Sequence, residues 1–352
     1  MILSRVVLHP LLLAVALVPT SLLSQTKAEA TIERLTSDAA AIIPGTAHLE
    51  KVATCCEWLE GPAWAPDGRL FVSDTDLNEI LAISSDSKVS IFKKPSGLVD
   101  PSFHGKEPGT NGNAFDASGR LTVAGHALHQ VFRFDQLQGS SSMTVLADRY
   151  QGKRFNSPND LTYASNGSLF FTDPPYGLAS QQDNDPKKEL PFNGVFMIRD
   201  AAHKAPGSAP TEPALLIRDM TRPNGIALSP DEKYLYVANS DPANPVWMRY
   251  PLDEKNGTVG AGKVLLSAKG APGVGGPDGI KVDVKGNLYG SGPGGIWIIS
   301  PEGKHIATIH VPERVSNCGW GGSDWQTLYI TASSSVYRIH LNIKGLDLTR
   351  RH

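Results

Sequence analysis

The sequence predicts an all-β protein, folded as a six-bladed β-propeller with four-stranded blades. Two observations support this prediction. Glycine and proline together account for 60 of the 352 residues, about 17%. This share is above the roughly 12% of average usage and favours many turns between short strands. In addition, a short pattern recurs six times: a small or polar start, an apolar strand, a polar turn and a second strand.

The six copies define the blades. They read EGPAWAPDGRLFVSD (60–74), NGNAFDASGRLTVAG (111–125), NDLTYASNGSLFFTD (159–173), NGIALSPDEKYLYVAN (224–239), DGIKVDVKGNLYGSG (278–292) and NCGWGGSDWQTLYITA (317–332). Their starts are 39 to 65 residues apart, which excludes a strict solenoid and suits blades with loop insertions. Each copy predicts a hairpin, and further strand-like runs follow at 79–83, 131–134, 195–198, 246–250, 296–299 and 336–339. Four strands per copy are typical of a propeller blade.

Two insertions between these strands are rich in proline and polar residues. They cover 178–193, with the run QQDNDPKKELP, and 200–213, with the run HKAPGSAPTEP. Such composition predicts surface loops.

The N-terminus predicts a signal peptide over residues 1–30. Arg5 precedes an apolar stretch at 11–18, and Ala28-Glu29-Ala30 has the A-x-A form of a cleavage site. The apolar stretch is far shorter than the ~20 residues that span a bilayer, which disfavours a membrane anchor. We therefore expect an exported protein, periplasmic or secreted, whose residues 31–352 form one propeller domain.

The low charge and the closed fold limit the kinds of partner that we expect the protein to bind. The formal net charge is −2 and only 19% of residues are charged, so we expect neither a nucleic acid nor a membrane partner. A closed propeller leaves no sheet edge that demands a partner, so we expect a monomer or a weak oligomer.

The three cysteines lie near the two ends of the repeat. Cys55 and Cys56 precede the first copy and Cys318 lies in the last. Either one of the pair bonds Cys318 and locks the ring, or all three are buried free thiols.

The first residues of the six copies predict a cation site. The innermost strand of each blade begins at the same mouth of the central channel, so these residues should converge there. They are Glu60, Asn111, Asn159, Asn224, Asp278 and Asn317. Carboxylate and amide oxygens suit a hard divalent cation, most simply Ca²⁺ or Mg²⁺. A transition metal is disfavoured, because neither His nor Cys occupies any of these positions. Each Pro-Asn or Pro-Asp pair alone is an ordinary turn signal, but their common phase favours a site.

The loops that follow the second strand of each hairpin should border the same mouth. They carry His126 and His129, and the run Asp173 to Tyr176. A neutral imidazole at His126 is a candidate for proton transfer or for a substrate contact, although a lone loop histidine is often only solvated. His129 begins the next strand and is the weaker candidate.

Five segments resemble the gluconolactonase / regucalcin / luciferin-regenerating-enzyme family, most closely the exported bacterial gluconolactonases. They are EGPAW (60–64), NSPNDL (156–161), FFTDPPYGL (170–178), RPNGIALSPDEKYLYVANS (222–240) and GPDGI (276–280). The resemblance implies a six-bladed propeller that uses one divalent metal to hydrolyse lactones of sugar acids. It implies Glu60, Asn159, Asn224 and Asp278 as metal ligands, with Ca²⁺ as the expected ion and Mg²⁺, Mn²⁺ or Zn²⁺ as alternatives.

Two segments depart from the family pattern. Residues Asn156-Ser157-Pro158 resemble the bacterial members and lack an arginine that contacts sugar hydroxyls in animal regucalcins. The run VAGHALHQV keeps the family histidine as His126 but not its neighbours. Sugar recognition should therefore differ from that of the animal proteins.

The mechanism expected from these residues is metal-assisted hydrolysis of a cyclic ester. Asp278 is the predicted general base, with direct nucleophilic attack by Asp278 as an open alternative. Asn111, Asn159, His126 and Tyr176 are expected to orient a small lactone substrate. Two other classes stay open, because fold alone does not fix function. One is a non-catalytic propeller that binds a sugar or a protein, and the other is an esterase or phosphotriesterase with a non-sugar substrate.

Overall fold

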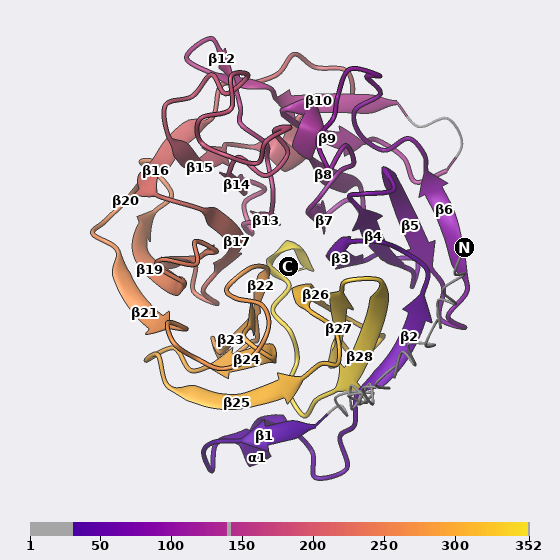
Figure 1. Cartoon of the computed structure of the whole chain (residues 1–352), viewed down its shortest axis with the longest axis vertical. Coiled ribbons are helices and arrows are strands. Elements are labelled where there is room, and N and C mark those ends of the chain that lie inside the picture. The colour runs from indigo at the N-terminus through magenta and orange to yellow at the C-terminus, as the bar shows by residue number, and fades with distance from the viewer. Residues whose placement is uncertain (1–30, 139–141, 351–352) are drawn as a thin grey trace, which may run out of the picture.

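The computed structural model describes residues 31–138 and 142–350 and confirms the six-bladed propeller. Six small antiparallel sheets are arranged in a ring, each with its first strand nearest the axis (Figure 1). The predicted signal peptide, residues 1–30, lies outside the described residues. Within the described ranges, no helix is long and apolar enough to cross a membrane.

The first three blades each follow the chain outward from the axis. Blade 1 contains β3 (Leu59–Trp64), β4 (Leu70–Asp74), β5 (Glu79–Ile83) and β6 (Val89–Lys93). Blade 2 contains β7 (Asn113–Phe115), β8 (Leu121–Gly125), β9 (Gln130–Phe134) and β10 (Met143–Ala147). Blade 3 contains β13 (Leu161–Tyr163), β14 (Leu169–Asp173), β15 (Asn193–Ile198) and β16 (Ala214–Met220).

Blades 4 and 5 each have a fifth strand, and blade 6 takes its outer strand from the N-terminal part of the chain. Blade 4 contains β17 (Pro223–Leu228), β18 (Tyr234–Asn239), β19 (Val246–Asp253) and β21 (Lys263–Ser267), and β20 (Thr258–Val259) also pairs with β19. Blade 5 contains β22 (Ile280–Val282), β23 (Leu288–Gly292), β24 (Gly295–Ile299) and β25 (His305–His310), with β1 (Ile32–Arg34) added at its outer edge. Blade 6 contains β26 (Val315–Gly321), β27 (Thr327–Ala332), β28 (Ser335–His340) and β2 (Glu50–Thr54).

Backbone pairing closes the ring. The N-terminal strand β2 pairs antiparallel with the C-terminal strand β28, with Glu50 opposite Arg338 and Thr54 opposite Ser335. Arg338 Nε also donates to Glu50 Oε2 at 2.8 Å. The first and last parts of the chain therefore share one sheet, and the ring needs no covalent link to close.

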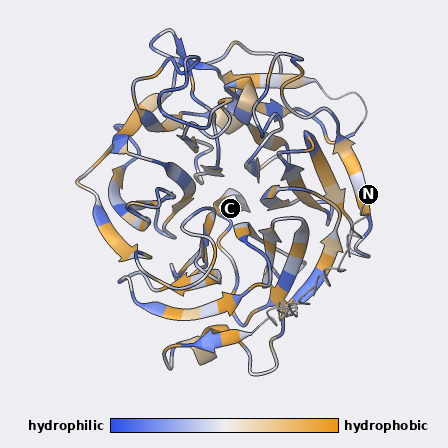
Figure 2. Ribbon diagram, viewed as in Figure 1, coloured by the Kyte–Doolittle hydropathy of each residue, from blue (hydrophilic) through white to orange (hydrophobic). Residues whose placement is uncertain are grey.

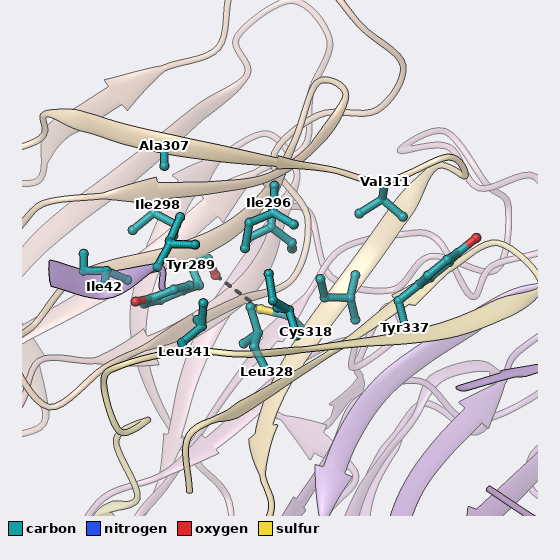
Figure 3. Close-up of a cluster of buried hydrophobic side chains, with 14 of the residues drawn as sticks. Ile42, Tyr289, Ile296, Ile298, Ala307, Val311, Cys318, Leu328, Tyr337 and Leu341 are labelled. Carbon is teal, nitrogen blue, oxygen red and sulfur yellow. Dashed lines mark hydrogen bonds between the residues drawn. The ribbon is translucent and has the colours of Figure 1, made fainter. Parts of the chain in front are cut away.

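The predicted disulfide to Cys318 is wrong, and so is the alternative of three free thiols. Cys55 and Cys56 are joined to each other. Cys318 is a buried free thiol in the cluster between blades 5 and 6, where its Sγ donates to the carbonyl of Tyr289 at 3.4 Å (Figure 3). Burial raises the pKa of this thiol to about 12, so Cys318 is a packing residue. The sequence placed the cysteines near the closing blade but could not show which pair is in contact.

Hydrophobic strands form the core between neighbouring blades. Every residue of β4, β5, β8, β14, β23 and β24 is buried. Apolar side chains run along the strands, whereas many connecting loops are hydrophilic (Figure 2). In the largest cluster, Ile296 and Ile298 of blade 5 pack with Leu328 of blade 6 and with Ile42 of the short helix α1 (Ala39–Ile42), as Figure 3 shows.

The remaining elements are short. They are the hairpin β11 (Arg149–Tyr150) and β12 (Lys153–Arg154) and the 3₁₀ turns η1 (His126–Leu128), η2 (Ala201–His203) and η3 (Leu348–Arg350). Both insertions lie between blade 3 strands and carry no strand, which agrees with the predicted loops. The first of them, at 178–193, is anchored by buried Leu178, Asp185 and Leu190.

Neighbouring inner strands approach so closely that glycine is required between them. Gly225 N donates to the carbonyl oxygen of Asp278 at 3.0 Å, across blades 4 and 5. A Cβ at Gly225 would lie 2.2 Å from that oxygen. The glycine of the Pro-Asn-Gly motif thus allows this close contact, which the sequence does not predict.

We therefore expect Gly225→Ala to lower the free energy of unfolding by about 3 kcal/mol, because the added methyl group must push two inner strands apart. Gly276→Ala is the matched control, since a Cβ at Gly276 meets no atom within 4 Å. Chemical denaturation of both variants measures the difference. Equal stability of the two would contradict the role given to this contact.

Candidate active site at the channel mouth

The structure brings the six predicted residues together at one end of the axis, which we call the channel mouth. Each lies at or just before the start of an inner strand. Hydrogen bonds connect their neighbourhoods around the ring: Gly112 N donates to Asn159 O at 2.7 Å, Thr172 Oγ1 to Asn224 O at 2.7 Å, and Gly279 N to Ser316 O at 2.8 Å. Asn317 Nδ2 donates to Glu60 Oε2 at 3.2 Å. The convergence follows from the propeller phase, because every inner strand runs in the same direction along the axis.

Three acidic side chains, Glu60, Asp160 and Asp278, form what we call the acidic cluster. Burial, followed by the charges of Asp278 and Asp160, raises the pKa of Glu60 well above its usual range. Burial likewise raises the pKa of Asp278, and the charges of Glu107 and Asp160 add to this effect. Arg314 and a hydrogen bond from Asn224 oppose it. Such a cluster is costly unless positive charge compensates it.

Lys281 compensates only one member of the acidic cluster. Its Nζ lies 3.5 Å from Asp160 Oδ2 and donates to the carbonyl of Ile280 at 2.9 Å. Glu60 and Asp278 have no ion-pair partner within 4 Å among the described residues. The mouth therefore carries two carboxyl groups whose charge a divalent cation would balance.

The donors at the mouth fit a hard cation. Glu60, Asn111, Asn159 and Asn224 are all buried, and Asn111 Oδ1 accepts no hydrogen bond within the described structure. A buried oxygen without a donor is rare and marks a place where a cation or a ligand group would be favourable. Within the described residues, no group of three or more His, Cys, Asp or Glu side chains is arranged to hold a metal. Any ion at this mouth would therefore depend on amide oxygens as well as on carboxylates.

Tyr176 forms part of the wall beside Asn224. Its hydroxyl lies 2.7 Å from Ser240 Oγ, which in turn lies 3.4 Å from Asn224 Nδ2. Burial raises the pKa of Tyr176 to about 12, so the phenol stays protonated. The chain of polar groups places the Tyr176 hydroxyl near the predicted ligand Asn224, and its role toward a substrate stays a prediction.

His126 is fully buried and is not a solvated loop residue. Its Nδ1 lies 3.1 Å from Pro158 O, and its Nε2 lies 3.1 Å from Glu107 Oε2. His129 Nδ1 lies 2.7 Å from Asn156 O, and burial lowers the pKa of this histidine. His126 thus belongs to the mouth through Glu107, whereas His129 stabilises the adjoining loop.

Besides Asp160 of the acidic cluster, sequence reasoning missed three groups at the mouth. Glu107 lies in the long connection between β6 and β7, and Lys281 follows the Asp-Gly-Ile motif inside the channel. Arg314 stacks over the ring of Trp58 at 5.2 Å, and the same ring faces Lys106 Nζ at 5.7 Å. None of these residues occupies a phased position, so the repeat gave no signal for them. Arg314, at the start of blade 6, places an arginine at the mouth, whereas the segment Asn156-Ser157-Pro158 contains none.

A cavity of about 160 Å³ lies at the opposite end of the axis. It is lined by the far ends of the inner strands, including Trp64, Tyr163 and Trp320, and by the C-terminal residues Leu346 and Leu348. Leu346 N donates to Val282 O at 2.9 Å, and the C-terminus lies near the axis in Figure 1. The C-terminal segment therefore covers the end of the channel away from the acidic cluster.

Fold and mouth together define a class: six-bladed propellers with an oxygen-rich polar centre at one end of the axis. Residues 58–334 match the SMP-30/Gluconolactonase/LRE-like region, and the chain belongs to this family. It is 38% identical over 317 residues to a gluconolactonase of Zymomonas mobilis, covering 87% of this chain and 84% of that protein.

Solved structures agree with this assignment. A gluconolactonase of Xanthomonas campestris superposes with a TM-score of 0.72 at 29% identity, covering 88% of this chain and 94% of that one. Regucalcin of Agrobacterium tumefaciens, described as a calcium-binding protein, superposes with a TM-score of 0.66. At 18% identity, with coverage of 85% and 96%, the latter shows the shared fold alone.

Proposed function

We propose that this protein is a metal-dependent lactonase that opens lactones of sugar acids by hydrolysis. The observation that carries the proposal is the acidic cluster at the channel mouth, in which Glu60 and Asp278 have no ion-pair partner within 4 Å among the described residues. The 38% identity to the Zymomonas gluconolactonase over most of both chains supports the same reaction class. We further propose export, which the Cys55–Cys56 disulfide supports because disulfides persist in oxidising compartments.

Glu60, Asn159, Asn224 and Asp278 are the residues that would hold the cation. Bound there, a divalent ion would supply Lewis-acid polarisation of the lactone carbonyl. The oxygen-only donor set fits the hard cations Ca²⁺ and Mg²⁺ better than Mn²⁺ or Zn²⁺, and Ca²⁺ is the ion we propose. Asn317 holds the Glu60 carboxyl through its 3.2 Å hydrogen bond. Asn224 contributes a hydrogen bond to Asp278, so the two carboxyl groups are oriented by amides on neighbouring blades.

Asp278 is the proposed general base. A carboxylate oxygen not engaged by Asn224 would accept the proton of the attacking water. Asn111, whose Oδ1 has no donor, and the protonated hydroxyl of Tyr176 would orient hydroxyl groups of the substrate. His126 would contribute through Glu107, because both of its ring nitrogens already face acceptors.

The proposal is tested by assaying purified protein on aldonolactones, aliphatic esters and a phosphotriester. We expect hydrolysis of aldonolactones that a chelator abolishes and Ca²⁺ restores, since Glu60 and Asp278 have no ion-pair partner within 4 Å among the described residues. Calorimetric titration of the chelated protein with Ca²⁺ should find one site per chain. Activity that survives complete chelation would refute metal dependence, and activity confined to apolar esters or the phosphotriester would refute the substrate class.

A further inference from the structure

We infer that Glu107 forms part of the substrate-binding wall and makes the site selective for lactones that carry hydroxyl groups. This inference rests on the proposed lactonase function and adds to it the residue that distinguishes a sugar lactone from an alkyl lactone. Glu107 occupies no phased position, and its place at the mouth comes only from tertiary contacts.

Two blades hold the carboxylate of Glu107. Its Oε2 lies 3.1 Å from Nε2 of His126, which belongs to η1 of blade 2. Its Oε1 accepts a 2.8 Å hydrogen bond from Nε2 of Gln181, in the insertion of blade 3. The Glu107 carboxylate therefore holds the connection between β6 and β7 against blades 2 and 3 at the mouth.

His126 has no ring nitrogen left for a substrate. Pro158 O is an acceptor, so Nδ1 must carry a proton to bond it. Nε2 faces the carboxylate, and the ring is fully buried. His126 is consequently a positioning residue that acts on the site by orienting Glu107.

The Glu107 carboxylate remains accessible and lies near the acidic cluster. Its side chain is 14% exposed, whereas that of His126 is 0% exposed. Its negative charge raises the pKa of Asp278 and of Glu60. The neighbouring Lys106 pairs with Asp76 at 3.2 Å. Among the described residues, the ion-pair partner of Glu107 is His126.

An ionised carboxylate can only accept hydrogen bonds, so it favours binding of a ligand that carries hydrogen-bond donors. Two of its lone-pair sites are used by His126 and Gln181, and the others are free for substrate hydroxyls. A polyhydroxylated lactone would satisfy them, whereas an alkyl lactone would strip water from the carboxylate without replacing it. A hydrogen bond to a charged group of this kind corresponds to roughly a 10- to 100-fold preference.

The test compares Glu107→Gln with the wild-type protein on D-glucono-1,5-lactone and δ-valerolactone. We expect kcat/KM for gluconolactone to fall roughly 10- to 100-fold, mainly through a higher KM, and kcat/KM for δ-valerolactone to change less than 3-fold. Ca²⁺ affinity, measured by calorimetry, should stay within 3-fold. Glu212→Gln is the matched control, because Glu212 is exposed and accepts only from the backbone of Gln151.

His126→Gln and Gln181→Met test the support of Glu107. Each should lower the preference for gluconolactone over δ-valerolactone by less than Glu107→Gln does. The ratio between two substrates does not respond to a loss of folded protein, so a partly unfolded variant still gives a reading.

Distinct results overturn distinct claims. An unchanged substrate ratio in Glu107→Gln, or an equal loss on both lactones, refutes the selectivity assigned to Glu107. A tenfold or larger loss of Ca²⁺ affinity in that variant shows a cation ligand instead and also refutes it. Wild-type protein inactive on both lactones contradicts the proposed function itself, whatever the variant does.

Discussion

Replacing Asp278 by asparagine should reduce kcat by about 10²- to 10⁴-fold while the propeller stays folded. The amide has the size of the carboxyl group and can still meet Asn224, but it cannot accept a proton from water. Asp278 also lies in the acidic cluster, so removing its charge relieves repulsion with Glu60 and should not destabilise the chain. Steady-state kinetics at saturating Ca²⁺, together with circular dichroism, measures both effects.

Asp241→Asn is the matched control for this substitution. Asp241 lies in the loop after β18 and accepts a hydrogen bond from Ala243 N at 2.9 Å, outside the acidic cluster. An Asp278→Asn protein with wild-type turnover would refute the assignment of Asp278. In a single turnover of the wild-type protein in ¹⁸O-labelled water, label in the Asp278 carboxyl group would show a covalent anhydride whose Asp278 carbonyl is attacked by water, and so would identify Asp278 as the nucleophile.

Glu60, Asn224 and Asp278 could be predicted because their positions follow from a local rule. A repeat fixes which residue begins each inner strand, and a closed ring brings those starts to one mouth. The same rule predicted the third strands well: the run at 79–83 is β5, Glu79–Ile83, and the run at 296–299 lies within β24, Gly295–Ile299. Periodic features of a propeller are therefore readable from one sequence.

Features that depend on contacts between non-equivalent loops were not readable. Glu107 reaches His126 and Gln181 from a long irregular connection, and nothing in its neighbours marks a carboxylate of the mouth. The pairing of β2 with β28 joins the two ends of the chain, and β2 has no copy in the repeat. For the cysteines, the sequence showed proximity to the closing blade, but the bond is between the adjacent residues Cys55 and Cys56.

The metal-free protein should become less stable as the pH rises from about 4 to about 8. Burial and neighbouring charges raise the pKa of Asp278 from 3.8 to about 8, and the pKa of Glu60 is raised in the same direction. In this window the folded state holds protons that the unfolded chain has released. Stability therefore falls with rising pH across this window.

A cation bound by Glu60 and Asp278 should reverse this trend, because it favours the ionised carboxyl groups. Thermal unfolding of the chelated protein should show a Tm roughly 10 °C lower at pH 8 than at pH 5, and added Ca²⁺ should raise Tm more at pH 8. The double variant Glu60→Gln, Asp278→Asn is the control, since neither amide titrates and the chelated protein should then lose most of its pH dependence. A chelated wild-type protein whose Tm is level or rising across this range would show that ionising the two carboxyl groups does not destabilise the folded state, and the charge argument for a cation at the mouth would fail with it.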